Sequence, residues 1–463
     1  MNRRQLLKSL ALLSGGIAVG SLMERVKSAS AQDRTRLSKY FRLPADVTVF
    51  RDGDYAVAVN NKGRVIARSD EHAEVMQTAI DTTGGKVYIK PGDYYIGRTI
   101  TINRHGVVLE GETRGRGDIT LRTRLIATAS LSSLIQIGSS SSLVYDVYIR
   151  SLQLHGNNMV NNILDAYANG LVVEDTITWN AKNNGIYIRR IDGACETKLV
   201  RVVSANNGYN GIRIGTGDIH LTDVITGKNG EAGVLFFAET AVVQGLIENL
   251  HSYGNRYGLW VDSAINMMIT NSYLEGNNKC GLWLRAYNFP VERVLIDNCV
   301  FWMNNQDESG WPHIQLSCEG CDIVDFIVRG CAFDPSADAV NYYIPQGTVQ
   351  NGLITECIIR GPVKVPPNVK IKRCIGYATE NSGIETITGD GTTTTFTIDV
   401  THGLVSDSVV VRVTLDRPGS WRAWLVDTDA DDFKETVRIE VTYDTAPASG
   451  ESVPVYWEAV TVS

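Results

Sequence analysis

The sequence predicts an all-β protein: a right-handed, single-stranded parallel β-helix with an N-terminal capping helix, followed by a small C-terminal antiparallel β-sandwich. Two observations carry this prediction. Short β runs recur about every two dozen residues with no helix between them, and the texture of the sequence changes near residue 385. We therefore divide the 463 residues into an export signal over 1–31, a β-helix domain over 32–384 and a sandwich domain over 385–463.

The first residues are typical of an export signal. Arg3 and Arg4 precede an uncharged run over 9–23, and the small residues Ala29, Ser30 and Ala31 follow as a cleavage site. The segment "RRQLLK" resembles a twin-arginine signal, which implies an extracellular, cell-surface or periplasmic protein. A transmembrane anchor is the alternative, although an apolar run of 15 residues is short for a bilayer.

The net charge excludes two classes of partner. The whole chain carries 44 Lys and Arg against 51 Asp and Glu. Residues 1–31 hold five of those bases and one of those acids, so the mature chain has 39 bases and 50 acids, a net charge of −11. We expect no general attraction to nucleic acid or anionic lipid, and no transmembrane segment after signal cleavage.

A helix is expected in the opening segment over 69–102. Val75, Met76, Ala79 and Ile80 have the spacing of one apolar helix face. Because an open solenoid end presents an unpaired strand edge, we expect this helix to cover the N-terminal end.

The repeat itself consists of short strands that open on glycine. Such strands begin at Gly185, Gly211, Gly233, Gly258 and Gly281, at intervals of 26, 22, 25 and 23 residues. An Asn- or Gly-rich turn precedes each of them. Strands at this spacing can wind into a solenoid whose turns pair edge to edge, ~4.8 Å apart.

A second strand lies between the glycine strands, and its copies align in columns. Asn249, Asn271 and Asn298 form one column, and the next is formed by Cys299, Cys331, Cys357 and Cys374. All eight cysteines fall between Cys195 and Cys374. We expect buried, stacked thiols, which behave as small apolar groups. Disulfides are the alternative, as is a metal site at the "CEGC" of 318–321, which has half the spacing of a zinc site.

Alternation along the glycine strands separates a core face from an outer face. The inward set is Ile186, Ile188, Ile212, Ile214, Val234, Phe236, Leu259, Val261, Leu282 and Leu284. The outward set is Tyr187, Arg189, Arg213, Leu235, Phe237, Trp260, Asp262, Trp283 and Arg285. Rings in file with cations and an acid suit a polysaccharide. The alternative is that loops or the C-terminal domain cover this face and the tryptophans are packing.

The segment that follows extends the outer face. "PHIQLS" continues the strand series and places His313 on the outer face, and Asp262 and Arg285 become neighbours across one coil step. An insertion over 302–312 brings Asp307, Glu308 and Trp311 beside His313, where a functional loop and a solvated loop are both open.

The chain resembles the pectate-lyase-like (pectin lyase fold) superfamily in its Asn-rich turns, its "NNGI"-type strands and its opening segment over 69–102. The resemblance covers about residues 45–380 and implies a capping helix, a parallel β-helix and lyase chemistry with an Arg or Lys base. "LWVDS" at 259–263 is similar to the family's "WiDH", with Ser263 where His is expected. It also implies calcium as a cofactor, with Asp262 as the candidate ligand.

These considerations select the candidate residues. The catalytic candidates are Asp262, Arg285, Arg213, His313, Asp307 and Glu308. The substrate-binding candidates are Trp260, Trp283, Tyr187, Arg189, Phe237, Tyr287 and Trp311.

Three functions remain open, all with a polysaccharide or cell-surface glycan as partner. A lyase on uronate polymers comes first, because arginines on this face stand against the acidic charge of the chain. A hydrolase needs two carboxylates, here Asp262 with Asp307 or Glu308. A non-catalytic adhesin is the third, whereas the export signal disfavours a viral tailspike. No oligomeric state is predicted.

Residues 385–463 read as alternating strands separated by Gly, Pro and Asp turns, without cysteine. This small sandwich could cap the solenoid, bind carbohydrate or attach the protein to a surface. Asp427, Asp429 and Asp431 have alternate spacing that a calcium loop or a solvated turn would share.

Overall fold

The computed structural model describes residues 45–115, 122–190, 196–238, 243–366, 368–377, 380–401, 409–426 and 436–461. The predicted export signal, Cys195 and the aspartates at 427, 429 and 431 lie outside the described residues. In the described ranges, no helix is long and apolar enough to cross a membrane.

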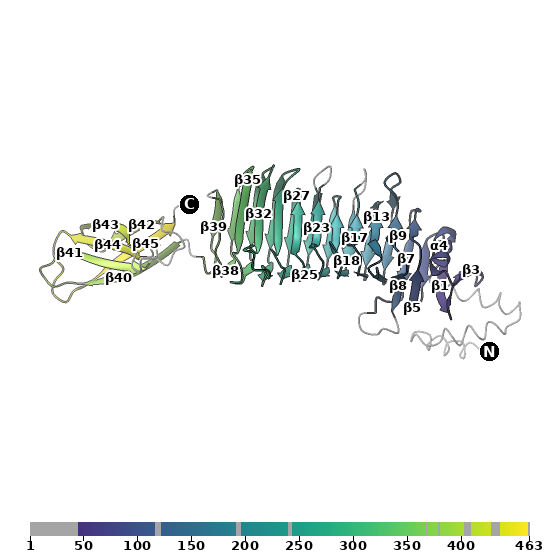
Figure 1. Ribbon diagram of the computed structural model, residues 1–463. Helices are drawn as coiled ribbons and strands as arrows, with labels where there is room; N and C mark the ends of the chain where they lie inside the picture. Colours follow the sequence, from purple (N-terminus) through teal and green to yellow (C-terminus); the bar gives the residue numbers. More distant parts are fainter. Residues whose placement is uncertain are drawn as a thin grey trace, which may run out of the picture.

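Three long parallel sheets form a solenoid, and each coil adds one strand to each sheet (Figure 1). Sheet A contains β1 (Val47–Asp52), β2 (Tyr55–Asn60), β3 (Val65–Ser69), β4 (Lys86–Ile89), β7 (Val108–Gly111), β11 (Tyr148–Arg150), β15 (Val172–Glu174), β18 (Thr197–Val200), β21 (Ile219–Thr222), β24 (Val243–Glu248), β27 (Ala264–Thr270), β30 (Val291–Asp297), β33 (Ile323–Arg329), β36 (Val349–Gln350), β37 (Gly352–Thr355) and β39 (Val369–Lys372). Apart from the antiparallel β1–β2–β3 edge, its strands pair in parallel.

Sheets B and C complete each coil. Sheet B contains β5 (Gly92–Ile96), β8 (Thr123–Ala127), β12 (Gln153–His155), β16 (Ile177–Trp179), β19 (Val203–Ala205), β22 (Ile225–Gly227), β25 (His251–Tyr253), β28 (Tyr273–Glu275), β31 (Val300–Trp302), β34 (Ala332–Phe333) and β38 (Ile358–Ile359). Sheet C contains β6 (Ile100–Ile102), β9 (Leu131–Ile137), β13 (Val160–Ala166), β17 (Asn184–Ile188), β20 (Ile212–Ile214), β23 (Ala232–Phe237), β26 (Tyr257–Asp262), β29 (Leu282–Ala286), β32 (Ile314–Glu319) and β35 (Val340–Gln346). A two-stranded bridge, β10 (Val144–Tyr145) with β14 (Ala168–Asn169), lies beside them. The predicted right-handed parallel β-helix is confirmed.

The repeat glycines at the start of β17, β20, β23, β26 and β29 are required by the close approach of the next coil. A Cβ atom on Gly185 would lie 2.7 Å from the carbonyl oxygen of Gly211, and one on Gly211 would lie 2.6 Å from that of Gly233. The same clash, at 2.5 Å, separates Gly258 from Gly281. Any side chain at these positions would push two coils apart, which explains why glycine recurs at this point of the repeat.

Burial confirms the inward half of the predicted alternation, whereas Tyr187, Leu235 and Asp262 of the outward set are also buried. All ten members of the inward set are fully buried in one continuous core. The predicted asparagine column is also confirmed: Asn249, Asn271 and Asn298 have positive φ of 55°, 51° and 54° at the corner between sheets A and B. Asn298 donates to Asn271 across one coil at 2.7 Å. Asparagine tolerates this left-handed conformation better than most residues, and its amide pairs with the next copy.

A second asparagine ladder runs inside the turns between sheets B and C. One asparagine lies on each of five successive coils, and the five are Asn207, Asn229, Asn255, Asn277 and Asn304. The Nδ2 atom of each lies 2.9 to 3.3 Å from the Oδ1 atom of the next. Each also accepts a backbone N–H from its neighbour's turn. These bonds satisfy polar groups that the core would otherwise leave unpaired.

The capping helix lies at the N-terminal end of the stack (Figure 1). It is α4 (His72–Thr82), and Val75, Met76, Ala79 and Ile80 are fully buried, as predicted. His72 adds a polar tie, because its Nδ1 accepts the backbone N–H of Tyr95 at 2.9 Å.

The cysteine column consists of thiols rather than disulfides. The seven cysteines within the described residues are free, and Cys299, Cys331 and Cys357 are buried. The backbone N–H of Cys299 donates to the sulfur of Cys331 at 3.4 Å, so successive members stack on successive coils.

The C-terminal segment forms two three-stranded antiparallel sheets around a core of its own. One sheet pairs β40 (Glu380–Thr388), β45 (Ser452–Thr461) and β42 (Val409–Leu415), and the other pairs β41 (Thr395–Thr401), β44 (Thr436–Tyr443) and β43 (Gly419–Val426). Val437, Ile439, Val441 and Val455 are fully buried between them. The predicted sandwich is confirmed, and its first strand begins at Glu380, five residues before the expected boundary.

Candidate functional site

The outer face of sheet C carries two parallel files of side chains. The register aligns Tyr187, Arg213, Leu235, Trp260, Trp283 and Gln315 in the first file. It aligns Phe237, Asp262, Arg285 and Ser317 in the second. Each step of a file crosses one coil, so the predicted row of rings, cations and an acid exists as a continuous strip.

The tryptophans of this strip stack on each other. The rings of Trp260 and Trp283 lie 4.4 Å apart between centroids with an interplanar angle of 22°. Tyr257, which the alternation argument left out, contacts Trp283 at 4.9 Å, and Trp311 meets Trp283 edge-on at 5.4 Å. The four rings form a small apolar cluster outside the solenoid core, together with the buried Cys280.

The insertion over 302–312 therefore covers part of the strip. Trp311 comes from this insertion and packs on Tyr257 at 5.5 Å. Trp260 and Trp283 remain partly exposed. The facing rings use part of their surface on each other, so a ligand meets the edges of the two indoles more than their faces.

An ion triad lies at the other side of Trp283. Arg285 donates from Nε and Nη2 to Glu319 at 3.0 and 2.7 Å, and from Nη1 to Asp262 at 3.4 Å. The guanidinium also lies 4.3 Å from the ring centroid of Tyr287, which is 46% exposed. The predicted contact of Asp262 with Arg285 is confirmed, and Glu319 is the carboxylate that the sequence interpretation missed.

Asp262 is the most perturbed carboxyl of the strip. Its side chain is 1% exposed, and burial raises its pKa to about 6 against the opposing charge of Arg285 and a hydrogen bond from Ser263 at 3.1 Å. A carboxyl that titrates near neutral pH can take or release a proton during a reaction.

A second ion pair sits further along the strip. Arg189 donates from Nε and Nη2 to Asp165, both at 2.8 Å, and Asn162 donates to the same carboxylate at 2.8 Å. The bidentate hydrogen bonds raise the pKa of Arg189. Arg189 also lies 3.9 Å over the ring of Tyr187. Asp165 is 4% exposed and was missed, because no repeat glycine precedes it in the sequence.

Arg213 lies beside the rings of both Tyr187 and Phe237. Its guanidinium lies 4.7 Å from the ring of Tyr187 and 5.1 Å from the ring of Phe237. The predicted outward set thus forms a cation–π series along the strip.

The prediction that His313 lies on the outer face is wrong. His313 is fully buried, because it precedes the first paired residue of β32 and aligns with the interior asparagine ladder. Nδ1 contacts Nδ2 of Asn304 at 3.0 Å, and Nε2 contacts the carboxylate of Asp334 at 3.0 Å. Burial lowers its pKa, so it ends the ladder as a neutral core residue.

Asp307 and Glu308 lie in an exposed turn of the insertion. Asp307 accepts the backbone N–H of Ser309 at 3.2 Å, and bonds from Ser309 lower its pKa. Glu308 has a positive φ of 52°. Among the described residues, Glu319 is the carboxylate that contacts Arg285 together with Asp262. The structure therefore pairs Asp262 with Glu319 instead of with Asp307 or Glu308.

The residues do not fit a calcium ion. Both carboxylate oxygens of Asp262 already face donors, Arg285 on one side and Ser263 on the other. In the described ranges, no group of three or more His, Cys, Asp or Glu side chains could hold a metal. A neighbouring guanidinium also disfavours a divalent cation.

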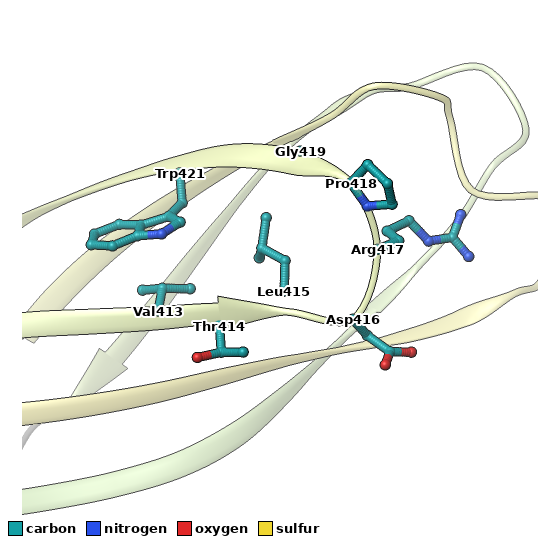
Figure 2. Close-up of a pocket in the computed structure, with 8 residues that line it drawn as sticks. All are labelled: Val413, Thr414, Leu415, Asp416, Arg417, Pro418, Gly419 and Trp421. Carbon is teal, nitrogen blue, oxygen red and sulfur yellow. The ribbon is translucent and has the colours of Figure 1, made fainter.

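The C-terminal sandwich has a shallow pocket at its β42–β43 hairpin. Figure 2 shows Trp421 beside Val413 and Leu415, with Asp416, Arg417 and Pro418 at the turn. Arg417 forms an ion pair with Glu451. The pocket contains none of the residues predicted from the repeats.

No family model matches this sequence, and no curated protein matches it. Several solved structures are similar to this one. The A-module of mannuronan C-5 epimerase AlgE6 from Azotobacter vinelandii is 15% identical over 66% of this chain and 94% of its own, with a TM-score of 0.44. The tailspike protein gp49 of Pseudomonas phage LKA1 is 13% identical over 87% and 94%, with a TM-score of 0.49. The enzymatically active domain of bacteriophage CBA120 tailspike protein 2 is 11% identical over 89% and 75%, with a TM-score of 0.48.

The three parallel sheets and the N-terminal cap confirm the architecture that the resemblance implies. The chain has the right-handed parallel β-helix fold. In this β-helix, Glu319 and Asp165 join the strip only through coil stacking. A signal was present for Glu319 alone, since it lies two residues beyond Ser317 in the strand that the sequence interpretation had already extended.

Proposed function

We propose that the protein is a polysaccharide-active β-helix enzyme that holds a glycan along the outer face of sheet C and cleaves it by β-elimination at a uronate unit. The observation that carries the proposal is the triad of Asp262, Arg285 and Glu319, which is bordered by the exposed ring of Tyr287 and the partly exposed ring of Trp283. Rings beside a guanidinium fork suit a sugar that bears a carboxylate.

The chemistry assigns a role to each group of the triad. β-Elimination removes the C5 proton, forms the C4–C5 double bond from that electron pair and expels the C4 oxygen, which takes up a proton from water. The uronate carboxylate would replace Glu319 on the Arg285 fork, and the C5 proton would pass to the Asp262 carboxylate. A pKa of about 6 keeps Asp262 largely ionised at neutral pH. Because Asp262 is covered, Arg285 must shift as the uronate binds.

Hydrolysis is the second candidate, and a specific observation favours it. Two carboxylates, Asp262 and Glu319, contact one guanidinium from opposite sides. In this scheme protonated Asp262 would donate to the glycosidic oxygen and Glu319 would activate water. The uronate scheme needs Glu319 only to hold Arg285 in the free enzyme, whereas the hydrolytic scheme needs it in every turnover.

This difference defines the experiment. The mature protein and its Asp262→Asn and Glu319→Gln variants are incubated with alginate and polygalacturonate, and both ultraviolet absorbance of unsaturated products and new reducing ends are measured. Absorbance that Asp262→Asn abolishes and Glu319→Gln retains supports the lyase. Reducing ends without absorbance, lost in both variants, support the hydrolase.

The third outcome overturns the enzymatic proposal. If neither signal appears but the protein still binds one of these polymers, and Trp260→Ala abolishes that binding, the strip is a non-catalytic glycan-binding surface. Tyr148→Ala serves as the matched control, because Tyr148 is a 39% exposed ring on the outer face of sheet A.

A further inference from the structure

The outer face of sheet B carries a cluster of rings that the sheet C strip does not include. We define the sheet B strip as His251, Tyr253, Tyr273, Glu275 and Trp302, which come from the three successive strands β25, β28 and β31. The register pairs His251 with Tyr273, and it aligns Tyr253, Glu275 and Trp302 in one file. Five side chains from three coils therefore share one outward face.

The rings and the carboxylate contact each other. The imidazole of His251 lies 5.0 Å from the ring of Tyr253 and 5.4 Å from the ring of Tyr273. Its Nε2 lies 2.8 Å from the carboxylate of Glu275. Trp302 continues the series at 6.4 Å from Tyr273. The carboxylate fixes the imidazole between two phenols, so the strip is an ordered surface.

The rings of this strip are turned differently from those of sheet C. A Cβ atom on Gly227 would lie 2.5 Å from Cζ of Tyr253, so the phenol reclines across the glycine of the preceding coil. Tyr253 stays partly exposed in this position, whereas the stacked indoles of Trp260 and Trp283 cover part of each other's faces. In the described structure Trp302 is 44% exposed, and the neighbouring Val300 is 38% exposed.

We propose that the sheet B strip is a second glycan-binding surface, and that it takes a polysaccharide without acidic groups. Sugar rings stack their apolar faces on aromatic faces, and the hydroxyls require hydrogen-bonding groups at the ring edges. The phenols, the imidazole and the Glu275 carboxylate supply such groups. The strip contains one carboxylate and neither Lys nor Arg, so it would repel a polyuronate and leaves an uncharged chain as its ligand.

The repeat length supports the same ligand. Successive coils rise by ~4.8 Å, which is about the advance of one sugar unit in an extended chain. Rings on three successive coils would therefore meet successive or alternate sugars. Because this surface lies on a different sheet from Asp262 and Arg285, it would bind glycan whether or not sheet C cleaves one.

The test uses the full mature protein and insoluble polysaccharides. Microcrystalline cellulose, insoluble xylan and chitin are the uncharged probes, and calcium alginate beads are the acidic probe. Binding isotherms are measured for the wild type, Trp302→Ala, the double variant Tyr253→Ala with Tyr273→Ala, and the control Tyr148→Ala. We expect at least one uncharged probe to bind, and each lost ring to weaken Kd about three- to tenfold.

Two further variants keep the proposal falsifiable. Trp302→Phe retains a ring and should retain most of the affinity, whereas Trp302→Ala should not, with both variants unchanged in thermal midpoint. Trp283→Ala on sheet C should leave binding to the uncharged probe unchanged. The proposal is overturned if no uncharged probe binds, if the sheet B variants bind as the wild type does, or if Trp283→Ala removes the same binding.

Discussion

Trp260 and Trp283 stack with their ring centroids 4.4 Å apart, close to the rise of one β coil. The stack therefore runs along the solenoid axis, and each ring stabilises its neighbour. The two interpretations of these tryptophans, as a ligand-binding face and as packing, are both partly satisfied, because the tryptophans lie on the outer face and also pack on one another.

Replacement of Trp283 should lower stability as well as the binding of an acidic glycan to the sheet C strip. Trp283→Ala removes its stacking on Trp260, the contacts with Tyr257 and Trp311, and the Nε1 hydrogen bond to Ser317 at 2.9 Å. We expect a loss of about 2 kcal/mol, less than for a fully buried tryptophan because the ring is partly exposed. Chemical denaturation measures it, and an unchanged midpoint would show that the cluster contributes no packing energy.

The pH dependence of stability should report Asp262. Its folded pKa of about 6 lies above the ordinary value of 3.8, so the folded state holds this proton more tightly than the unfolded state. The stabilisation that this proton gives the folded state is complete below about pH 4 and is lost as pH rises through about 6. The unfolding free energy should fall less over this window in Asp262→Asn than in the wild type, by on the order of 2 kcal/mol. Denaturant titrations from pH 4 to 7 test this; equal slopes in both proteins would contradict it.

His313 should behave as a structural residue. His313→Ala leaves the amide of Asn304 and the carboxylate of Asp334 without their buried partner. We expect the unfolding free energy to fall by about 3 kcal/mol, while turnover per folded molecule on any substrate found stays as in the wild type. Loss of turnover at unchanged stability would restore the catalytic role that the sequence indicated.

The Asp165–Arg189 pair should contribute more to stability than an exposed carboxylate does. Asp165→Asn leaves the Arg189 guanidinium beside a neutral amide. The side chain of Asp165 is only 6% exposed, so water cannot replace the lost carboxylate. We expect destabilisation of about 2 kcal/mol, discounted because Arg189 itself is 32% exposed. Asp307→Asn is the control, with an expected change within about 0.5 kcal/mol. Similar values for the two variants would show that the pair is not structural.

The cysteine column predicts insensitivity to reduction. Because the seven described cysteines are free, the thermal midpoint should be the same with and without dithiothreitol. Iodoacetamide should label Cys299, Cys331 and Cys357 only after denaturation, since these thiols are buried. A lower midpoint under reducing conditions would indicate a disulfide in the protein as purified.

The sequence by itself determined the solenoid, because each of its signals is local and repeats. Gly185 and its equivalents leave no room for a Cβ atom, Asn271 and its equivalents occupy a left-handed corner, and Ile186 alternates with Tyr187 at the period of a strand. The position of α4 as a cap followed from one apolar face. These features depend on a few neighbouring residues, so they can be read without knowing the coil geometry.

Only the tertiary structure decided which side chains meet. Glu319 reaches Arg285 from a strand 34 residues later in the chain, and Trp311 folds back onto Trp283 from an insertion. His313 is buried because it lies in the turn before β32, where it meets Asn304 at the end of the asparagine ladder, whereas Gln315 and Ser317 keep the expected register with Trp283 and Arg285. Stacking distance and register are set by the whole coil, which is why the fold could be predicted from the repeats and the composition of the site could not.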